Sequence, residues 1–595
     1  MITSSLHQNN RLIRKTIMRV YPSSFAANLT TSIAPMVDTL LAGALLGKEA
    51  IAAVAIGLPV LGIFQALAQM VVNGMGVKLA VAAGRGDQKE MNRIYSSGLA
   101  GTVVLGSFFI VICLLMAELL TNLFGGAGNP AVGAQAALYL RALCVSVLMA
   151  SVNMFFARVL ALYGYQKAVF LAAVIAIAGN VVFSILYITL LPVGMKIAGL
   201  GLGTWNGGIL AVISAYTIKK KKKIPMCFRF RDFDGKELVR IFRAGVPSSG
   251  NSLADAVAAG VVNNIIVAGF GGDTTALSVY TAVKAVDTFG KAAAQSAAGS
   301  SAPLYGILYG SRDKNGILRT VRESVKIGIV AVVVWCSLLF TMVPALGSFY
   351  GMGDTPQFRS GVIICMLLMP LSVILRVFTQ LFESTEKVGM GILYSVVPDS
   401  VVYPVLLVFL LPLMGYSGLW LSFAGNALPF GVGLYLVRSL KNKTLRVSME
   451  RLLCLDETIR DHVPALDISI RSNHTDVTGI SDQVHRFLTE QKASSRTAYM
   501  TALCLEELAA DFVAHTMKEN SKSADRTIMD IKLFSDEDSL RIIIRNEASS
   551  YNPLDFALDD ATFAKVGVKL AQKVARKIEY SYVYQLNIIT IVLDK

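Results

Sequence analysis

One carboxylate stands alone in the first apolar segment of the chain. The segment from Pro22 to Gly47 is PSSFAANLTTSIAPMVDTLLAGALLG, and Asp38 is its only charged residue. A stretch of roughly 20 mostly apolar residues crosses a bilayer as a helix. An ionisable side chain at that depth is costly unless it faces a polar interior. The pattern therefore predicts a functional acid inside a membrane, and the alternative is a shifted segment boundary that leaves Asp38 at the membrane surface.

The second half of the chain also carries charges inside apolar segments. They are Asp255, Lys284, Asp287, Lys291, Arg376 and Asp399. Lys284 and Asp287 are three residues apart and Asp287 and Lys291 four apart, so one helical face can hold all three as a self-compensating cluster. Asp255 has no second acid on its own segment and lies eight residues after Pro247, which leaves it available to line a cavity. Lys284 and Asp287 remain cavity candidates beside it.

The composition places these charges in a membrane protein. The chain has 595 residues, of which only 16% are charged, and its mean hydropathy is +0.57, which excludes an ordinary soluble enzyme. The net charge of +15 gathers in short loops such as Lys219–Lys223, where basic residues set membrane orientation. We therefore expect anionic lipid and no nucleic acid as the partner of these loops. The seven cysteines have no spacing typical of a zinc or redox site.

Six apolar spans are predicted in the first half, at residues 22–47, 50–75, 95–122, 132–160, 166–190 and 197–218. Basic residues precede the first span and return after the second, so we expect both termini and the Lys219–Lys223 loop in the cytoplasm. The loops at 120–137 and 345–360 are then outside. This pattern divides the membrane part into a first lobe at 1–218, a basic linker at 219–239 and a second lobe at 240–440.

The second half repeats the first. Pro22 has its counterpart in Pro247, an offset of 247 − 22 = 225, and the loop Gly84–Asp87 matches Gly310–Asp313 one residue further on. Gln166-Lys167 is matched with Glu386-Lys387 in the same way. Each half crosses the membrane an even number of times, so the halves are parallel repeats. The first offset carries Asp38 to Asn263, which keeps a polar group and loses the charge.

These features resemble the multidrug and toxic compound extrusion (MATE) transporters. The resemblance rests on PMVDTLLAGALLGKEAIAAVAIGLP, on the loop that ends at Asp87 and on the repeat, and it covers roughly residues 15 to 440. It implies an all-α membrane protein with twelve helices in two six-helix lobes, alternating access, and efflux driven by sodium or protons. It also implies a cation-coupling site at Asp38, Asn180 and Thr204, with Asp38 as a sodium ligand.

The sequence departs from this family at Ser184, where many members place a second acid. Asp38 is then the single carboxylate of the site. Oxygen-bearing side chains suit a hard cation. The alternative for Asn180 and Thr204 is plain hydrogen bonding between helices, a common use of small polar residues in membrane bundles.

The composition changes after Lys441, and a linker at 441–460 leads into a cytosolic α/β domain at 461–595. Alternating apolar residues predict one sheet with helices on one face. The predicted strands are LDISIR, TIMDIKLF, SLRIIIRN, KIEYSYV and LNIITIVL, and the predicted helices are 476–491, 495–517 and 563–576.

This tail resembles the ATP-binding domain of anti-sigma-factor serine kinases, within the histidine-kinase-like ATPase class. The resemblance implies a general base at Glu507, a magnesium ligand at Asp511, and further nucleotide contacts from His515, Asn546 and Gly567. Asp511 stands where the family has asparagine, Asn546 replaces the acid that binds adenine, and glycines of the phosphate loops are missing, which removes close backbone approach. The alternative is a fold retained for regulation or protein contact.

We therefore expect a secondary active exporter of organic, often cationic and drug-like substrates. It would be a monomer in the plasma membrane, with a sodium ion or a proton as coupling ion, and its tail would be a regulatory domain that contacts a cytosolic protein and binds ATP and magnesium weakly or not at all. No Gly-x-x-x-x-Gly-Lys-Ser/Thr loop occurs in the chain, so an ATP-driven pump is not expected. The alternatives are a membrane-tethered kinase or regulator that senses through the transporter half, and a lipid-linked sugar flippase.

Overall fold

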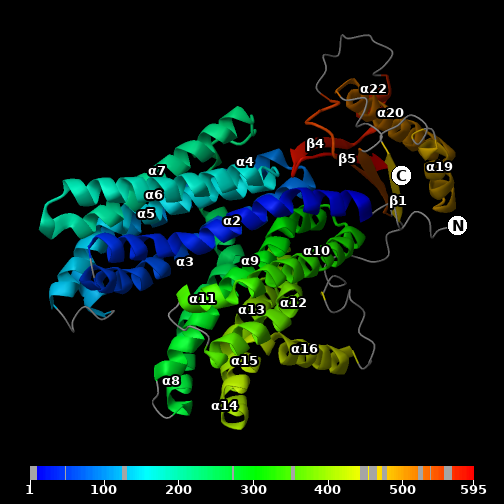
Figure 1. Ribbon diagram of the computed structural model, residues 1–595. Helices are drawn as coiled ribbons and strands as arrows, with labels where there is room; N and C mark the ends of the chain where they lie inside the picture. Colours follow the sequence, from blue (N-terminus) through cyan, green and yellow to red (C-terminus); the bar gives the residue numbers. More distant parts are fainter. Residues whose placement is uncertain are drawn as a thin grey trace.

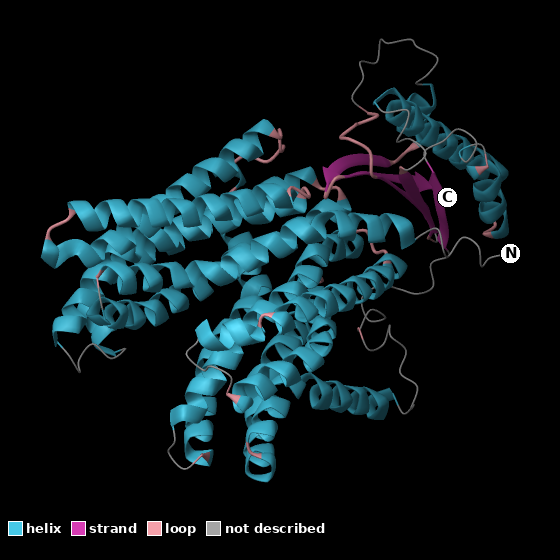
Figure 2. Ribbon diagram, viewed as in Figure 1, coloured by secondary structure: helices cyan, strands magenta, loops and turns pink. Residues whose placement is uncertain are grey.

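The structure is a computed structural model, and most of it is helical (Figures 1 and 2). It describes residues 10–46, 48–123, 130–270, 274–349, 355–442, 453, 465–471, 477, 479–519, 527–536, 538–554 and 566–595. Two groups of membrane helices diverge from each other, and a small sheet with helices lies at the end where the groups meet (Figure 1).

The first half forms long helices because its apolar segments contain few breakers. They are α2 (Asn10–Leu45), α3 (Lys48–Arg85), α4 (Gln88–Leu123), α5 (Pro130–Leu162), α6 (Gln166–Leu190) and α7 (Lys196–Lys221), with a short 3-10 turn η2 (Val193–Met195) before α7. The loop to the second half contains η3 (Phe230–Asp232).

The second half has the same order of long helices, with more interruptions. They are α8 (Gly235–Gly269), α9 (Thr274–Gly310), α10 (Lys314–Thr341), α11 (Val343–Phe349), α12 (Pro356–Ser384), α13 (Val388–Val397), α14 (Tyr403–Met414), α15 (Tyr416–Gly425) and α16 (Ala427–Asn442). A π-helical segment, η4 (Pro398–Val402), joins α13 to α14. Such segments are rare and frequently occur at functional sites.

Length and hydropathy mark eight of the described helices as able to cross a membrane, or nine if the bent pair α15–α16 counts as one span. Helices α2, α8 and α9, in each of which some side chains lie outside the described residues, are not among them. The structure is that of a multi-pass membrane protein, and the count of twelve spans stays a prediction.

The repeat is visible in two matching turns. Asp87 accepts a hydrogen bond from the backbone N–H of Glu90 at 2.9 Å and caps α4, and Asp313 accepts one from Gly316 at 2.8 Å and caps α10. The residue before each cap has a positive φ, 74° at Gly86 and 56° at Arg312. The structure therefore keeps the sequence-based match of these two loops.

The match of Gln166 with Glu386 is wrong by two residues. Helix α6 begins at Gln166 and α13 at Val388, an offset of 388 − 166 = 222. The positive-φ turn residues Gly164 and Glu386 keep the same offset. Side-chain similarity alone misplaced this turn, because the glycine of one copy is a glutamate in the other.

The two halves meet closely beside the tail. A Cβ atom on Gly74 of α3 would lie 1.8 Å from the backbone oxygen of Ile241 in α8, and one on Gly310 of α9 would lie 2.3 Å from that of Val81 in α3. Only glycine permits such backbone approach. Away from this end the helices of the two halves diverge (Figure 1), so the membrane part is closed beside the tail and open on the opposite side.

The tail is an antiparallel five-stranded sheet in the order β1-β2-β3-β5-β4. Its elements lie close to the predicted ones. They are β1 (Ala465–Arg471), α19 (Ile480–Glu490), α20 (Ser495–Glu519), β2 (Ile528–Ser535), β3 (Ser539–Asn546), α22 (Val566–Val574), β4 (Lys577–Val583) and β5 (Leu586–Asp594).

The two faces of the sheet have different partners because side chains alternate along a strand. One face carries Ile531, Ile542 and Ile591, which are buried in a core with α19, α20 and α22. The other face carries Ile543 and Ile588, which belong to the core of the membrane helices. The tail is therefore packed directly onto the membrane part.

Candidate functional site

Asp38 accepts hydrogen bonds from three other helices of the first half. Its side chain lies in α2 and is 7% exposed. Asn180 in α6 donates to Oδ1 at 2.9 Å, and Tyr139 in α5 donates to Oδ2 at 2.8 Å. Thr204 in α7 lies 3.1 Å from Oδ2. The structure thus brings together the three predicted residues Asp38, Asn180 and Thr204.

Close packing of α6 on α7 positions two of these donors. A Cβ atom on Gly207 would lie 2.4 Å from the backbone oxygen of Ala176, and one on Gly203 would lie 2.0 Å from Oγ of Ser184. Small residues let membrane helices approach this closely. Ser184 then donates to Oδ1 of Asn180 at 2.8 Å, which orients the amide so that its NH₂ group faces Asp38.

Tyr139 was not predicted from the sequence. It is 0% exposed and contributes a third oxygen-bearing group beside Thr204 and Asn180. Its position, in an apolar span with no acidic motif, gave no signal that it would reach Asp38. The site thus offers one carboxylate, two hydroxyl groups and one amide, a donor set that suits a hard cation or a proton.

The described residues contain no group of three or more His, Cys, Asp or Glu side chains that could hold a metal ion. Any cation held at Asp38 would therefore depend on one carboxylate together with neutral oxygens. Sodium at Asp38 and magnesium at Asp511 both stay predictions.

A cavity of about 330 Å³ lies mainly in the second half and is lined by five of the six predicted charged residues, namely Lys284, Asp287, Lys291, Arg376 and Asp399. Lys291 pairs with Asp287 at 2.7 Å, as the four-residue spacing predicts. Lys284 does not join this pair but lines the cavity, with its Nζ 5.9 Å from the ring centre of Tyr280. Asp399, in the π-helical segment, accepts from Asn426 at 2.7 Å. The predicted three-membered cluster is therefore a pair and a separate lysine.

Two further cavity candidates, Asp255 and Asn263, lie on α8, but their side chains fall outside the described residues. Whether they line this cavity stays a prediction.

A second cavity, of about 300 Å³, lies between the two halves. Arg158 from α5 donates to Asn73 of α3 at 2.6 Å, and Glu383 from α12 also lines the cavity. Neither charge was singled out from the sequence, although Arg158 lies within an apolar run and Glu383 at the end of one. Asn28 and Gln295 line both cavities, so the two adjoin.

The candidate nucleotide residues of the tail lie on the side of the sheet that carries the helices. Tyr551 donates to Asp511 at 2.7 Å, and its ring stacks on His515 with centres 3.9 Å apart. Burial and the neighbouring Asp511 raise the pKa of Tyr551. Both α20 residues are therefore already engaged by an aromatic side chain, which restricts a ligand's access to them.

The other three nucleotide candidates are spread along this side. Glu507 is half-buried on α20, one turn before Asp511, and Gly567 lies in the first turn of α22. Asn546 is fully buried, and its Oδ1 accepts from the backbone of Ala548 at 2.6 Å. Its side chain thus closes a local turn in place of the acid that the resembled family uses.

A family model and a set of solved structures match this chain. The MatE family model matches residues 23–186, which include Asp38, Tyr139, Asn180 and Ser184. A search of curated proteins finds no match.

The fold is that of solved MATE structures. A crystal structure of MATE in complex with MaD3S has a TM-score of 0.66 at 19% identity, and the match covers 77% of this chain and 100% of that one. The outward-facing conformation of a multidrug resistance MATE family transporter of the MOP superfamily has a TM-score of 0.64 at 20% identity, covering 76% and 99%. Part of this chain therefore has no counterpart in them.

Proposed function

We propose that the chain is a MATE-type secondary active exporter that couples efflux of organic, drug-like substrates to a sodium or proton gradient. The observation that carries the proposal is the Asp38 site, in which one buried carboxylate joins α2 to α5, α6 and α7 within a MATE fold. A structural acid would need no such position, because an apolar residue could pack there without the cost of burying a charge.

The coupling step follows from the chemistry of Asp38. Its charge is matched by neutral donors, so a proton or a sodium ion can compensate it. The two states of the site then differ in how strongly they hold α2 against α5, α6 and α7. A ligand shifts a conformational equilibrium only through such a difference in affinity. Cation binding can thereby favour one arrangement of the two halves over the other.

The test is transport in proteoliposomes. A panel of cationic, neutral and anionic dyes is offered under a sodium gradient alone, a proton gradient alone and neither. We expect gradient-dependent flux of at least one organic cation, and the gradient that drives it identifies the coupling ion. Absence of flux for every dye under both gradients would contradict the proposal.

One observation favours a second candidate, a membrane-tethered regulator that senses through its transporter half. The tail contacts both halves directly, through Leu162 and Gly164 of the first and Asp313 of the second. A domain so placed can respond to the arrangement of the helices. If the chain is such a regulator, the dye experiment should show no flux even though the protein is correctly folded.

We further propose a plasma-membrane protein with both termini in the cytoplasm and a tail that acts as a regulatory domain. The support for the orientation is the distribution of basic residues. The closed end of the membrane part, where the tail lies, is then the cytoplasmic end.

A further inference from the structure

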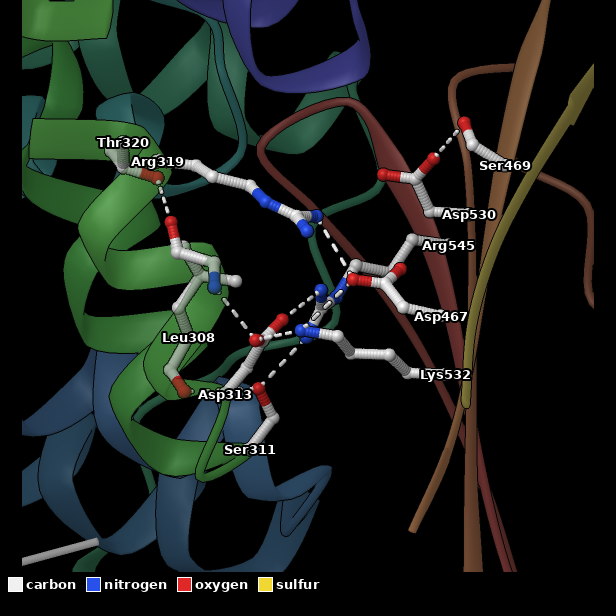
Figure 3. Close-up of polar contacts among 11 residues, drawn as sticks. Leu308, Ser311, Asp313, Arg319, Thr320, Asp467, Ser469, Asp530, Lys532 and Arg545 are labelled. Carbon is white, nitrogen blue, oxygen red and sulfur yellow. Dashed lines mark hydrogen bonds and ion pairs between the residues drawn. The ribbon is translucent and has the colours of Figure 1, made fainter. Parts of the chain in front are cut away.

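The tail is joined to the second half by a buried cluster of charges (Figure 3). Arg545 of β3 pairs with Asp313 at 2.7 Å and donates to Ser311 at 3.0 Å, and Lys532 of β2 pairs with the same carboxylate. Burial by itself would raise the pKa of Asp313, but these two cations hold it below its usual range. Arg319 of α10 adds an ion pair to Asp467 of β1 at 2.9 Å. The second half thus holds three strands of the sheet.

The same tail is also joined to the first half. Glu547, which directly follows β3, accepts from Lys15 at 2.5 Å and from Arg19 at 2.7 Å, both in α2. Gln585 donates to the backbone oxygen of Gly164, in the turn between α5 and α6, at 2.9 Å. The tail therefore spans the junction of the two halves.

Tyr584 fills the junction itself. It lies in the turn between β4 and β5, where Tyr584 and Gln585 have φ values of 54° and 58°, and it is 0% exposed. Its backbone N–H donates to Leu162 of the first half at 2.6 Å, and its hydroxyl donates to the backbone oxygen of Ser300 in the second. One residue of the tail thus bonds to both halves.

The turn lies next to the cavity between the halves. Leu162 lines that cavity, as does Gly299, the neighbour of Ser300. If the halves separate at this end, Leu162 and Ser300 move apart, and Tyr584 cannot stay bonded to both. The ion pairs of Asp313 with the tail and of Glu547 with α2 would face the same conflict, because one hydrogen-bonded sheet carries the tail side of both.

We propose that the tail is an intramolecular clamp, which holds the two halves closed at its end and must undock before they can open there. The inference rests on the proposed alternating access. It goes further in naming the tail's target as the cytoplasmic ends of both halves, and its mode of action as control of the conformational equilibrium. A partner that covered the charged face of the sheet would release the clamp.

The internal repeat supplies a matched control. Asp313 and Asp87 occupy the same capping position in the two halves, but only Asp313 forms ion pairs with the tail among the described residues. Asparagine can cap a helix as aspartate does. Asp313→Asn therefore keeps the turn and leaves Arg545 buried beside an uncharged group, whereas Asp87→Asn changes only the cap.

The test uses spin labels on the full chain, in a background without native cysteines. Labels at positions 89 and 326, both exposed and one in each half, report the separation of the closed ends. Labels at 326 and 499, an exposed tail position, report docking. Loss of one partner of a buried ion pair shifts such an equilibrium by roughly a hundredfold to a few thousandfold, so Asp313→Asn should add longer distances for both pairs. Asp87→Asn should match the unmodified protein.

A second variant separates undocking from misfolding. Asp313→Asn combined with Lys532→Met and Arg545→Leu removes the carboxylate and both of its cations. This variant should restore the short distances, because replacing buried ion pairs by apolar groups is often neutral. Glu547→Gln tests the first-half contact independently and should give a smaller population of long distances, since Lys15 and Arg19 are partly exposed.

Two outcomes would overturn the clamp. In one, Asp313→Asn and Glu547→Gln both leave the tail docked. In the other, the tail undocks while positions 89 and 326 keep their distance. The distances are measured without substrate or gradient, so a failure to find transport leaves this test intact.

Discussion

Substitution of Asp38 separates its role in coupling from its role in the fold. Two variants remove the charge, Asp38→Asn and Asp38→Ala, and both relieve the cost of burying a carboxylate. The difference in stability between the two variants therefore reports the hydrogen bonds to this side chain. Tyr139 and Asn180 donate to different oxygens of Asp38. Asparagine keeps one oxygen and can accept from only one of these donors, whereas alanine accepts from neither.

The structure sets the size of that difference. Without an acceptor, Tyr139 loses the one bond that its hydroxyl makes among the described residues, and Asn180 loses the partner of its NH₂ group. Thr204 keeps a second acceptor, the backbone oxygen of Leu200 at 3.1 Å. Alanine orphans both donors and asparagine orphans one of them. Each orphaned buried donor costs about 1–3 kcal/mol, so Asp38→Ala should be about 1–3 kcal/mol less stable than Asp38→Asn.

Thermal unfolding in detergent and dye transport in proteoliposomes measure the two effects. We expect Asp38→Asn to unfold near the temperature of the unmodified protein and Asp38→Ala clearly below it. Both should lose gradient-driven accumulation, roughly 5- to 150-fold if the coupling free energy has an ordinary size. Glu118→Gln, at a 72% exposed acid of the same half, is the matched control and should retain full transport.

Two results would refute this reasoning. Gradient-driven flux retained in well-folded Asp38→Asn would remove the acid from the coupling mechanism. Equal stability of the two variants would mean that the bonds to Tyr139 and Asn180 contribute nothing to the fold.

Three further predictions concern the tail and the topology. A single cysteine at position 221 should react with an impermeant thiol reagent only after intact cells are opened, and labelling from outside would reverse the predicted orientation. Calorimetry on the full chain should detect at most weak binding of ATP with magnesium, and micromolar binding that is lost in Glu507→Ala or Asp511→Ala would contradict this. Docking of the tail should weaken as the pH rises from about 4 to about 7. Burial raises the pKa of Asp530 to about 7, whereas the pKa of an exposed aspartate is near 4, so the docked state holds an extra proton in this range. The bond from Ser469 lowers this pKa, the charge of Asp467 raises it, and the cations Lys532 and Arg545 lower it. The distance between labels at 326 and 499 measures the effect, which should disappear in Asp530→Asn.

The sequence predicted much of the Asp38 site and of the tail sheet. An acid in an apolar span indicates a functional position without knowledge of its partners, because a charge at membrane depth is costly unless a polar interior surrounds it. Alternating apolar residues placed the five strands of the tail, because side chains on a strand alternate between two faces. The matching turns at Asp87 and Asp313 also followed from the sequence, since a cap and a turn are local features.

Only the tertiary structure decided which partners these residues have. Tyr139 is 101 positions from Asp38, and nothing in its own segment distinguishes it from a core tyrosine. Lys284 and Lys291 both have helical spacing to Asp287, but packing pairs Asp287 with Lys291 alone. The charged face of the tail sheet is the clearest case, because Lys532 and Arg545 would suit a solvated surface as well as a buried one. Periodicity determines which side chains share a face. What covers that face depends on contacts between segments more than 200 residues apart, such as Arg545 with Asp313, and these are fixed only when the whole chain has packed.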